Sequence, residues 1–470
     1  MNTRKNKKGG VKLSKKLIIL LLCLAVAVSV FSINFTSAAS KKVTLVVGNW
    51  PRENEPARVA AFKKYQKIMA EKYKVEVIPD YYQYAVSSFL PKAAAGTLPT
   101  LYNSWFTETQ KIAENGYAAD ITAPMKKAGW DKALNPQVLP LLSYNGKIYA
   151  VPNYGYVQGL ECNVQLFKAA GLVDAGGVPK APKTYEELAE TAKIIKEKTG
   201  AAGFVLDTNN NTGGWHFMNI AWSFGTVFEK KVVGKWTASF NSPEGVAALQ
   251  YVKDLKWKYK VLPETTLLDW ASGQQVLATN QGAMLFFAGT EHDGFNFQID
   301  NYKISKDNIA MFSLPAGPKG RYSLIGGDTW MFAPNATRAQ IEAGLKWVEL
   351  LGKSPKFTDE IKANEIANFK TDVAGNHVVG CNSLQIWTDK ASIKARNELR
   401  AKYVNVNLAL FKDYNESKNT YRAEEPVACQ ELYKALDKVI QAVLTDANAD
   451  PKALLDKAAA DFQKDVLDKQ

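Results

Sequence analysis

Short apolar strands alternate with amphipathic helices along most of the chain. Residues 43–47 (Val-Thr-Leu-Val-Val) are β-branched and apolar, and a Gly48–Pro51 turn follows them. Apolar positions from Val59 to Tyr73 then recur at helical spacing. Residues 75–78 are again apolar at alternate positions and end at Pro79. The pattern therefore predicts a strand, a helix and a second strand, in that order.

Several later helices are marked by the residues at their first turn. Each has a Ser, Thr or Asp followed by a proline, or by Glu or Gln three residues on, as at Thr184/Glu187, Ser242/Pro243, Thr337/Gln340 and Asp450/Pro451. Extended structure resumes at residues 204–206. Because strands and helices interleave, the pattern predicts an α/β protein with largely parallel sheets.

The N-terminal segment is typical of an export signal. A basic stretch precedes an apolar run from Leu17 to about Ile33, and Ser37-Ala38-Ala39 supplies a small-residue cleavage site, so residues 1–39 are predicted to be a signal peptide. An uncleaved anchor is the alternative, because the run approaches the ~17 to 25 residues of a spanning helix. Leucines before Cys23 disfavour lipidation there. The mature protein is expected to be exported, extracellular or associated with the cell surface, or periplasmic if the cell has an outer membrane.

Composition and charge narrow the class of protein. The 470 residues are 46% hydrophobic and 22% charged, which is typical of a large globular protein with two domains or two lobes around a groove. The net charge of +13 suggests nucleic acid at first, but seven of the 59 basic residues and no acidic residue lie in positions 1–39. The mild charge of the remainder argues against a nucleic-acid partner.

Sequence signatures of catalysis are missing. The three histidines lie outside HExxH spacing, and the chain lacks GxSxG, P-loop and GxGxxG motifs. We therefore expect no catalytic residues, no metal and no cofactor. Three cysteines remain after the signal, Cys162, Cys381 and Cys429, and their spacing leaves the connectivity open. Cys381 with Cys429 is the first disulfide to test.

Tryptophan is the conspicuous residue type. Five of the 11 tryptophans fall in loop-like segments beside Gly, Asn, Asp or Ser: Trp50, Trp105, Trp215, Trp270 and Trp330. An aromatic face beside hydrogen-bonding side chains suits a sugar, because the C–H face of the sugar stacks on the ring while its hydroxyls find donors and acceptors. The alternative is that each tryptophan is a core residue, which is the better interpretation for Trp257 and Trp347.

Several segments in a fixed order resemble the extracellular solute-binding proteins of ABC sugar importers, in the branch that includes maltodextrin-binding proteins. They are Ile148–Pro152, Leu166–Leu172, Pro182–Leu188, Phe240–Gly245, Gly282–Met284 and Gly326–Trp330. The resemblance covers essentially the whole mature chain. It implies a two-lobed, periplasmic-binding-protein-like α/β fold with a hinge and a ligand cleft between the lobes. It also implies that residues 40–152 and 321–372 form the first lobe, and 153–320 and 373–470 the second.

Positions that match the family place these residues at the cleft: Trp50, Trp105, Tyr154, Trp215, Gly289-Thr290-Glu291, Asp328 and Trp330. The chain departs from the family at Glu161-Cys162, where an aromatic pair is common, and at residues 289–291, which lack the usual tryptophan.

We hypothesise that tryptophans from both lobes stack an oligosaccharide while Asn103, Glu291 and Asp328 bind its hydroxyls. Closure of the lobes would then present the ligand to the membrane permease of an ABC transporter, without any reaction and with the protein as a monomer. Two other hypotheses stay open at this point. One is an exported carbohydrate hydrolase that uses two carboxylates in the same groove. The other is an anchored surface protein that senses its ligand.

Overall fold

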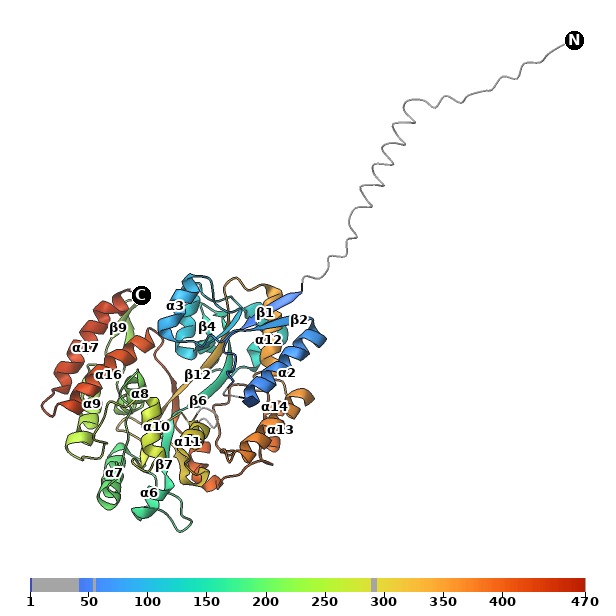
Figure 1. Ribbon diagram of the computed structural model, residues 1–470. Helices are drawn as coiled ribbons and strands as arrows, with labels where there is room; N and C mark the ends of the chain where they lie inside the picture. The colour runs from blue at the N-terminus through green and yellow to red at the C-terminus, as the bar shows by residue number, and fades with distance from the viewer. Residues whose placement is uncertain (2–41, 54–55, 289–293, 470) are drawn as a thin grey trace.

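The computed structural model describes Met1 and residues 42–53, 56–288 and 294–469, so the predicted signal peptide lies outside the described residues apart from Met1 (Figure 1). Two sheets organise these residues. The larger sheet has the order β13-β12-β3-β1-β2, with β6 also paired to β12. Its strands are β1 (Val43–Val47), β2 (Val75–Pro79), β3 (Leu101–Trp105), β6 (Ala150–Val157), β12 (Tyr322–Phe332) and β13 (Thr420–Ala423).

The smaller sheet has β7 (Gly159–Asn163) between β10 (Met284–Phe287) and β11 (Ile309–Phe312). Both of its pairings are antiparallel. In the larger sheet β1 runs parallel to β2 and β3, whereas β12 runs antiparallel to β3 and β6. Strand β12 is also parallel to β13, so the larger sheet is mixed, and the prediction of largely parallel sheets is wrong for the smaller sheet. The segment 204–206 joins β10 through a single parallel bridge at Val205 and is not a full strand.

Helices surround both sheets (Figure 1). Those in the part of the chain that builds the larger sheet are α2 (Pro56–Tyr73), α3 (Val86–Ala94), α4 (Thr109–Glu114), α5 (Thr122–Ala128) and α12 (Arg338–Leu350). Those grouped with the smaller sheet are α6 (Val164–Ala169), α7 (Tyr185–Thr199), α8 (Thr212–Phe224), α9 (Pro243–Trp257), α10 (Trp270–Ala278), α11 (Asn296–Tyr302), α16 (Cys429–Thr445) and α17 (Pro451–Asp465).

Shorter elements complete the chain. Helices α13 (Asp359–Ala374), α14 (Lys390–Arg400) and α15 (Lys412–Asn415) precede β13. Two hairpins are formed by β4 (Ser143–Tyr144) with β5 (Lys147–Ile148), and by β8 (Glu229–Val232) with β9 (Lys235–Ala238). The 3-10 turns are η1 (Phe106–Glu108), η2 (Asp131–Ala133), η3 (Leu139–Leu142), η5 (Lys306–Asn308), η6 (Leu408–Leu410) and η7 (Leu467–Lys469).

The predicted helix starts are confirmed. They can be predicted from sequence because a cap depends only on residues within a single turn. The Thr337 side chain accepts from the Gln340 backbone and the Gln340 side chain accepts in return, which completes the capping box of α12. Thr184 accepts from the Glu187 backbone, but the Glu187 carboxylate accepts from Lys183 instead, so only half of that box forms. The Ser242 side chain caps α9 by accepting a hydrogen bond from the Gly245 backbone.

Within the described residues, several segments connect the two sheets or their helices. Gln158 separates β6 from β7, residues 313–321 connect β11 to β12, and residues 424–428 connect β13 to α16. The lobe boundaries expected from the sequence stay a prediction. The chain leaves the larger sheet after Val157, and β13, placed in the second lobe by the resemblance, pairs with β12 of the larger sheet.

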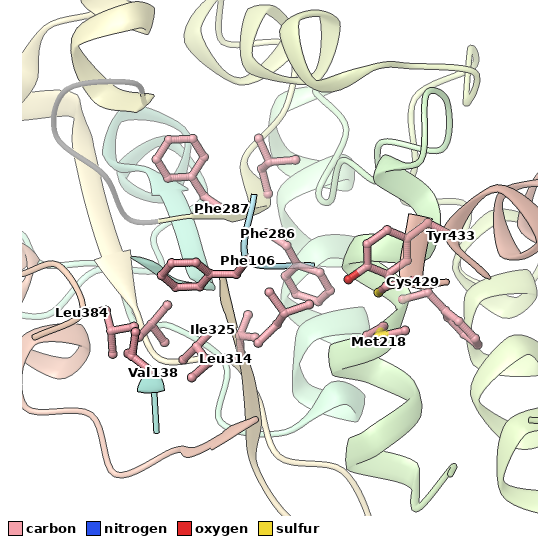
Figure 2. Close-up of a cluster of buried hydrophobic side chains, with 14 of the residues drawn as sticks. Phe106, Val138, Met218, Phe286, Phe287, Leu314, Ile325, Leu384, Cys429 and Tyr433 are labelled. Atoms are coloured by element: carbon pink, nitrogen blue, oxygen red, sulfur yellow. The ribbon is translucent and has the colours of Figure 1, made fainter. Parts of the chain in front are cut away.

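A continuous cluster of buried apolar side chains joins the two sheets to the helices. Figure 2 shows Phe286 and Phe287 of β10 together with Ile325 of β12 and Met218 of α8. Cys162, Cys381 and Cys429 are all buried and form no disulfide with one another. Among the described residues, no helix combines the length and apolarity needed to cross a bilayer.

Candidate ligand-binding site

Strand register brings three of the predicted site residues side by side. In β12, Asp328 lies directly opposite Trp105 of β3 on one side and Tyr154 of β6 on the other. Adjacent strands are about 4.8 Å apart and directly opposed side chains share one face, so the three side chains form a row across the sheet. All three are half-buried. The row lies where β3 ends and where β6 approaches the passage to the smaller sheet.

Ring contacts extend this row to α8. The Tyr154 ring lies 6.5 Å from the Tyr156 ring, and Tyr156 lies 5.8 Å from Trp215 with the two planes at 89°. Trp215 is the fourth residue of α8 and is half-buried. Trp105, Tyr154, Tyr156 and Trp215 are called the aromatic cluster below. It combines rings from the larger sheet with a ring from a helix that is grouped with the smaller sheet.

Glycines give the aromatic cluster its shape. A Cβ at Gly326 would lie 2.3 Å from the Tyr156 hydroxyl, and a Cβ at Gly327 would lie 2.8 Å from the Phe106 ring. The bare backbone of β12 at these two positions therefore lets aromatic rings lie across the sheet. The Gly326-Gly327 pair quoted for the family resemblance has this packing function in the structure.

The charges of two carboxylates, Glu424 and Asp328, act on the Tyr156 hydroxyl. The Glu424 carboxylate accepts a hydrogen bond of 2.7 Å from the Tyr433 hydroxyl, and burial raises the pKa of Glu424 to about 8, with a further rise from the charge of Glu108. Burial, with the charges of Glu424 and Asp328, keeps the pKa of Tyr156 well above its ordinary value. The Tyr156 hydroxyl is therefore a neutral hydrogen-bonding group at physiological pH.

A second acidic side chain near the cluster is held by tyrosine. The Glu108 carboxylate accepts a hydrogen bond of 2.9 Å from the Tyr84 hydroxyl, and burial raises the pKa of Glu108. The Tyr84 ring in turn contacts Trp105 edge to face, with 5.0 Å between centroids. These contacts fix the Trp105 ring at the end of β3.

Polar contacts join α4 and η1 to α16. The Lys111 ammonium lies 2.5 Å from the Glu431 carboxylate, and the Gln430 amide donates to the Thr107 hydroxyl at 3.3 Å. About one third of each charged side chain in the ion pair is exposed. Because α4 follows the larger sheet and α16 is grouped with the smaller one, the ion pair links the two halves of the molecule beside the aromatic cluster.

Three predicted site residues are buried in the structure, which argues against a direct ligand contact for them. Trp50 is 3% exposed and stacks on Trp347 at 5.7 Å. Trp330 is 2% exposed and lies in β12 opposite Asn103. Asn103 is itself buried, and its amide oxygen accepts from the Tyr84 backbone at 3.2 Å. At these exposures the two tryptophans offer almost no ring surface to a sugar, and Asn103 supports the loop that carries Tyr84.

The two remaining predictions fall elsewhere. Trp270 is the first residue of α10, where it is half-buried with its ring 4.9 Å from Phe297, and it has no ring contact with the aromatic cluster. Glu291 and its neighbours Gly289 and Thr290 lie outside the described residues. Within the described ranges, no group of three or more His, Cys, Asp or Glu side chains could hold a metal ion.

Sequence reasoning missed Tyr156, Glu424 and the acidic end of α16. Tyr156 lies two residues after Tyr154, so the alternation of faces along a strand would have identified it. For Glu424 and Glu431 the sequence gives no comparable signal, because they are some 270 residues from Tyr154 and reach the cluster only through the tertiary fold.

A separate cavity of about 460 Å³ lies between α13, α14 and the ends of β6 and β13. Its lining includes Arg396, Arg400 and Tyr421, and none of the aromatic cluster. Arg396 pairs with Glu365 and donates to the Lys356 carbonyl, while Arg400 donates to the Cys381 carbonyl. These contacts show that both arginines hold the surrounding segments together.

The fold and site define a two-lobed binding protein, with aromatic rings from both halves of the molecule meeting near the passages between its sheets. The chain belongs to the bacterial extracellular solute-binding protein family, which matches residues 50–355. This result confirms the resemblance inferred from the sequence motifs and the predicted two-lobed α/β class.

Individual relatives agree with this family. The diacetylchitobiose-binding protein DasA of Streptomyces coelicolor is 26% identical over 248 residues, which are 52% of this chain and 54% of that protein. The match therefore spans about half the length of that relative. The GacH receptor of Streptomyces glaucescens, solved with and without acarbose, has a TM-score of 0.64 at 19% identity, over 90% of this chain and 98% of that one. A chitin oligosaccharide binding protein has a TM-score of 0.62 at 21% identity, over 91% and 100% of the two chains.

Proposed function

We propose that this protein binds an oligosaccharide at the aromatic cluster and delivers it, by closure of the two lobes, to the permease of an ABC transporter. The observation that carries the proposal is the meeting of half-buried rings from both halves of the molecule beside Asp328 and Glu424. Rings supply stacking surface, and carboxylates and tyrosine hydroxyls supply hydrogen bonds to sugar hydroxyls. The relatives' ligands, diacetylchitobiose, acarbose and chitin oligosaccharide, belong to the same chemical class.

Further parts of the proposal concern location, partners and chemistry. The mature chain is exported, acts as a monomer outside the cytoplasm, and releases its ligand unchanged. Membership of an extracellular family supports export. Binding proteins of this kind bias a closing equilibrium through contacts made only in the closed form, so the ligand provides the signal that the permease recognises.

The decisive test is calorimetric titration of the mature protein with chitobiose to chitotetraose and maltose to maltotetraose, together with peptides and polyamines. We expect one sugar series to bind with micromolar affinity and to be recovered intact by chromatography. Trp215→Ala is expected to weaken that binding at least tenfold, because a lost ring contact of about 1.4 kcal/mol corresponds to that factor. Trp236→Ala, on the β8–β9 hairpin, is the matched control. Binding of peptides or polyamines but of no sugar would contradict the proposal.

We propose that the Lys111–Glu431 ion pair, which links the two halves of the molecule, favours the closed arrangement by a small amount. Lys111→Met is expected to weaken sugar binding about two- to fivefold, since a partly exposed pair contributes about 0.2–1 kcal/mol. The effect should shrink in 0.5 M NaCl because salt screens exposed charges. Titrations of Lys111→Met, Glu431→Gln and the double variant measure the coupling. Strictly additive losses would show that the two residues act independently.

A further inference from the structure

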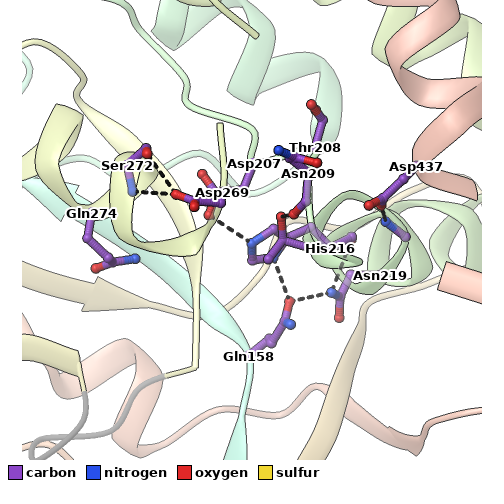
Figure 3. Close-up of polar contacts among 12 residues, drawn as sticks. Gln158, Asp207, Thr208, Asn209, His216, Asn219, Asp269, Ser272, Gln274 and Asp437 are labelled. Atoms are coloured by element: carbon purple, nitrogen blue, oxygen red, sulfur yellow. Dashed lines mark hydrogen bonds and ion pairs between the residues drawn. The ribbon is translucent and has the colours of Figure 1, made fainter. Parts of the chain in front are cut away.

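A buried hydrogen-bond network connects α8 to the strands that pass between the sheets. Asn219 of α8 donates from its amide nitrogen to Gln158 Oε1 at 2.7 Å (Figure 3). The amide oxygen of Asn219 accepts from the Leu324 backbone at 2.8 Å. Gln158 is the residue between β6 and β7, and its own backbone nitrogen donates to the Leu324 carbonyl at 2.9 Å. One side-chain amide therefore bridges the passage at Gln158 to strand β12 of the larger sheet.

The same helix carries a ring of the aromatic cluster. Trp215 lies four residues before Asn219, which is about one turn of α8. His216 lies between them in the network, with its ring 4.7 Å from the Trp215 ring and its Nδ1 3.3 Å from Gln158 Oε1. The other ring nitrogen of His216 lies 3.5 Å from Asp207 Oδ2. Gln158, Asn219 and His216 are at most 1% exposed.

Helix α8 is also held tightly at its first turn. The Asp437 carboxylate of α16 accepts from the backbone nitrogens of Asn211 at 2.7 Å and Gly214 at 2.8 Å. A Cβ at Gly214 would lie 2.5 Å from the Tyr433 Cα, so the two helices touch through their backbones. The start of α8 therefore cannot move without moving α16, and a displacement of Trp215 is passed along the helix to Asn219.

Breaking this network costs free energy, because an amide that loses its partner in the interior keeps its desolvation penalty. Any rotation of one lobe against the other that moves Gln158 or Leu324 relative to α8 must break or rebuild the bonds of Asn219. We infer that Gln158 and Asn219 are positioning residues that couple ligand contact at Trp215 to the relative arrangement of the two lobes. The inference rests on the proposed function, in which the ligand contacts Trp215.

Gln158 offers a matched pair of variants. Its amide nitrogen is buried and has no hydrogen-bond partner among the described residues, so the network uses only the amide oxygen. Gln158→Glu retains an acceptor at that place, whereas Gln158→Met has similar length and no acceptor comparable to the amide oxygen. A general loss of packing would affect both variants, and a loss of coupling would affect only Gln158→Met.

The experiment measures the distance between the lobes in the full mature chain by electron–electron resonance of two spin labels. The labels are attached at Lys126→Cys in α5 and Lys193→Cys in α7, which replace exposed side chains, while the native cysteines are buried. Without ligand, Gln158→Met is expected to give a broader distribution of label-to-label distances than the spin-labelled parent protein. Gln158→Glu is expected to give the same distribution as the parent. This arm needs no sugar, so it tests the coupling even if the titrations above find no sugar ligand.

With the sugar identified by titration, Gln158→Met is expected to lower affinity at least tenfold, within the 5- to 150-fold range of typical coupling between sites. Gln158→Glu should stay within threefold of the parent protein. Identical distance distributions for all three proteins would overturn the inference, as would equal broadening in both variants. Failure of every sugar to bind would instead contradict the proposed function.

Discussion

Trp50→Ala is expected to lower the free energy of unfolding by about 3–5 kcal/mol, while the folded fraction keeps its ligand affinity. The Trp50 ring stacks on Trp347 and contacts Phe62 edge to face at 5.1 Å, and it is 3% exposed. Removing this ring leaves a cavity in the core beside the larger sheet, and the neighbouring side chains fill that cavity only in part. Denaturant unfolding followed by circular dichroism measures the loss, and calorimetric titration of the folded protein measures the affinity.

Trp50→Phe is the control for this prediction, because it keeps an aromatic ring in the stack and should lose much less stability. The outcome against it is equally clear. If Trp50→Ala kept its unfolding midpoint but lost affinity tenfold or more, Trp50 would be a ligand contact and its place in the core would be incidental.

Glu161→Gln is expected to make the protein more stable above neutral pH. Glu161 lies in β7 with no exposure, and burial raises its pKa to about 8, although a hydrogen bond of 2.9 Å from the Gln298 amide opposes the rise. The ordinary pKa of a glutamate is 4.5, so the folded chain holds this proton more tightly than the unfolded chain does. Stability contributed by the protonated form is therefore lost as the pH rises from 4.5 through 8, by up to about 5 kcal/mol.

Melting temperatures of both proteins between pH 5 and pH 9 test this expectation. The parent protein should lose stability across the range more steeply than Glu161→Gln, and the difference should be largest at alkaline pH. Glu229 and Glu424 also have pKa values raised to about 8 by burial, but they are present in both proteins and cancel in the difference. Glu186→Gln on exposed α7 controls for the loss of one charge. Parallel profiles would show that Glu161 is ionised without cost in the folded state.

Prediction from sequence succeeded where the cause is local. The starts of α9 and α12 depend on a capping side chain and the backbone of the following turn, so Ser242 and Thr337 predict where these helices begin. The strand at residues 43–47 is likewise a run of β-branched residues whose preference does not depend on distant neighbours. The family resemblance rested on the order of such segments, and the family match confirms it.

The structure brings together only some of the predicted site residues, and the tryptophans show why. Trp50 and Trp215 both follow a Gly or Asn and have the same apparent suitability for a sugar. Trp50 packs on Trp347, nearly 300 residues away. Trp215 of α8 instead contacts Tyr156 in strand β6 of the larger sheet. Whether a ring is covered depends on what the rest of the chain places against it, and hydrophobicity alone gives both rings the same preference for burial.

The sequence by itself determined that this is an α/β chain with family motifs in a recognisable order and with helix starts set by neighbouring residues. It also predicts an export signal at residues 1–39. Only the tertiary structure decided which aromatic side chains stay half-exposed, that Glu424 and Glu431 join them, and that Asn219 bridges Gln158 to Leu324. The physical reason is the range of the interactions. Capping and strand preference act within a few residues, whereas burial and hydrogen-bond partnership depend on segments that meet only when the chain has folded.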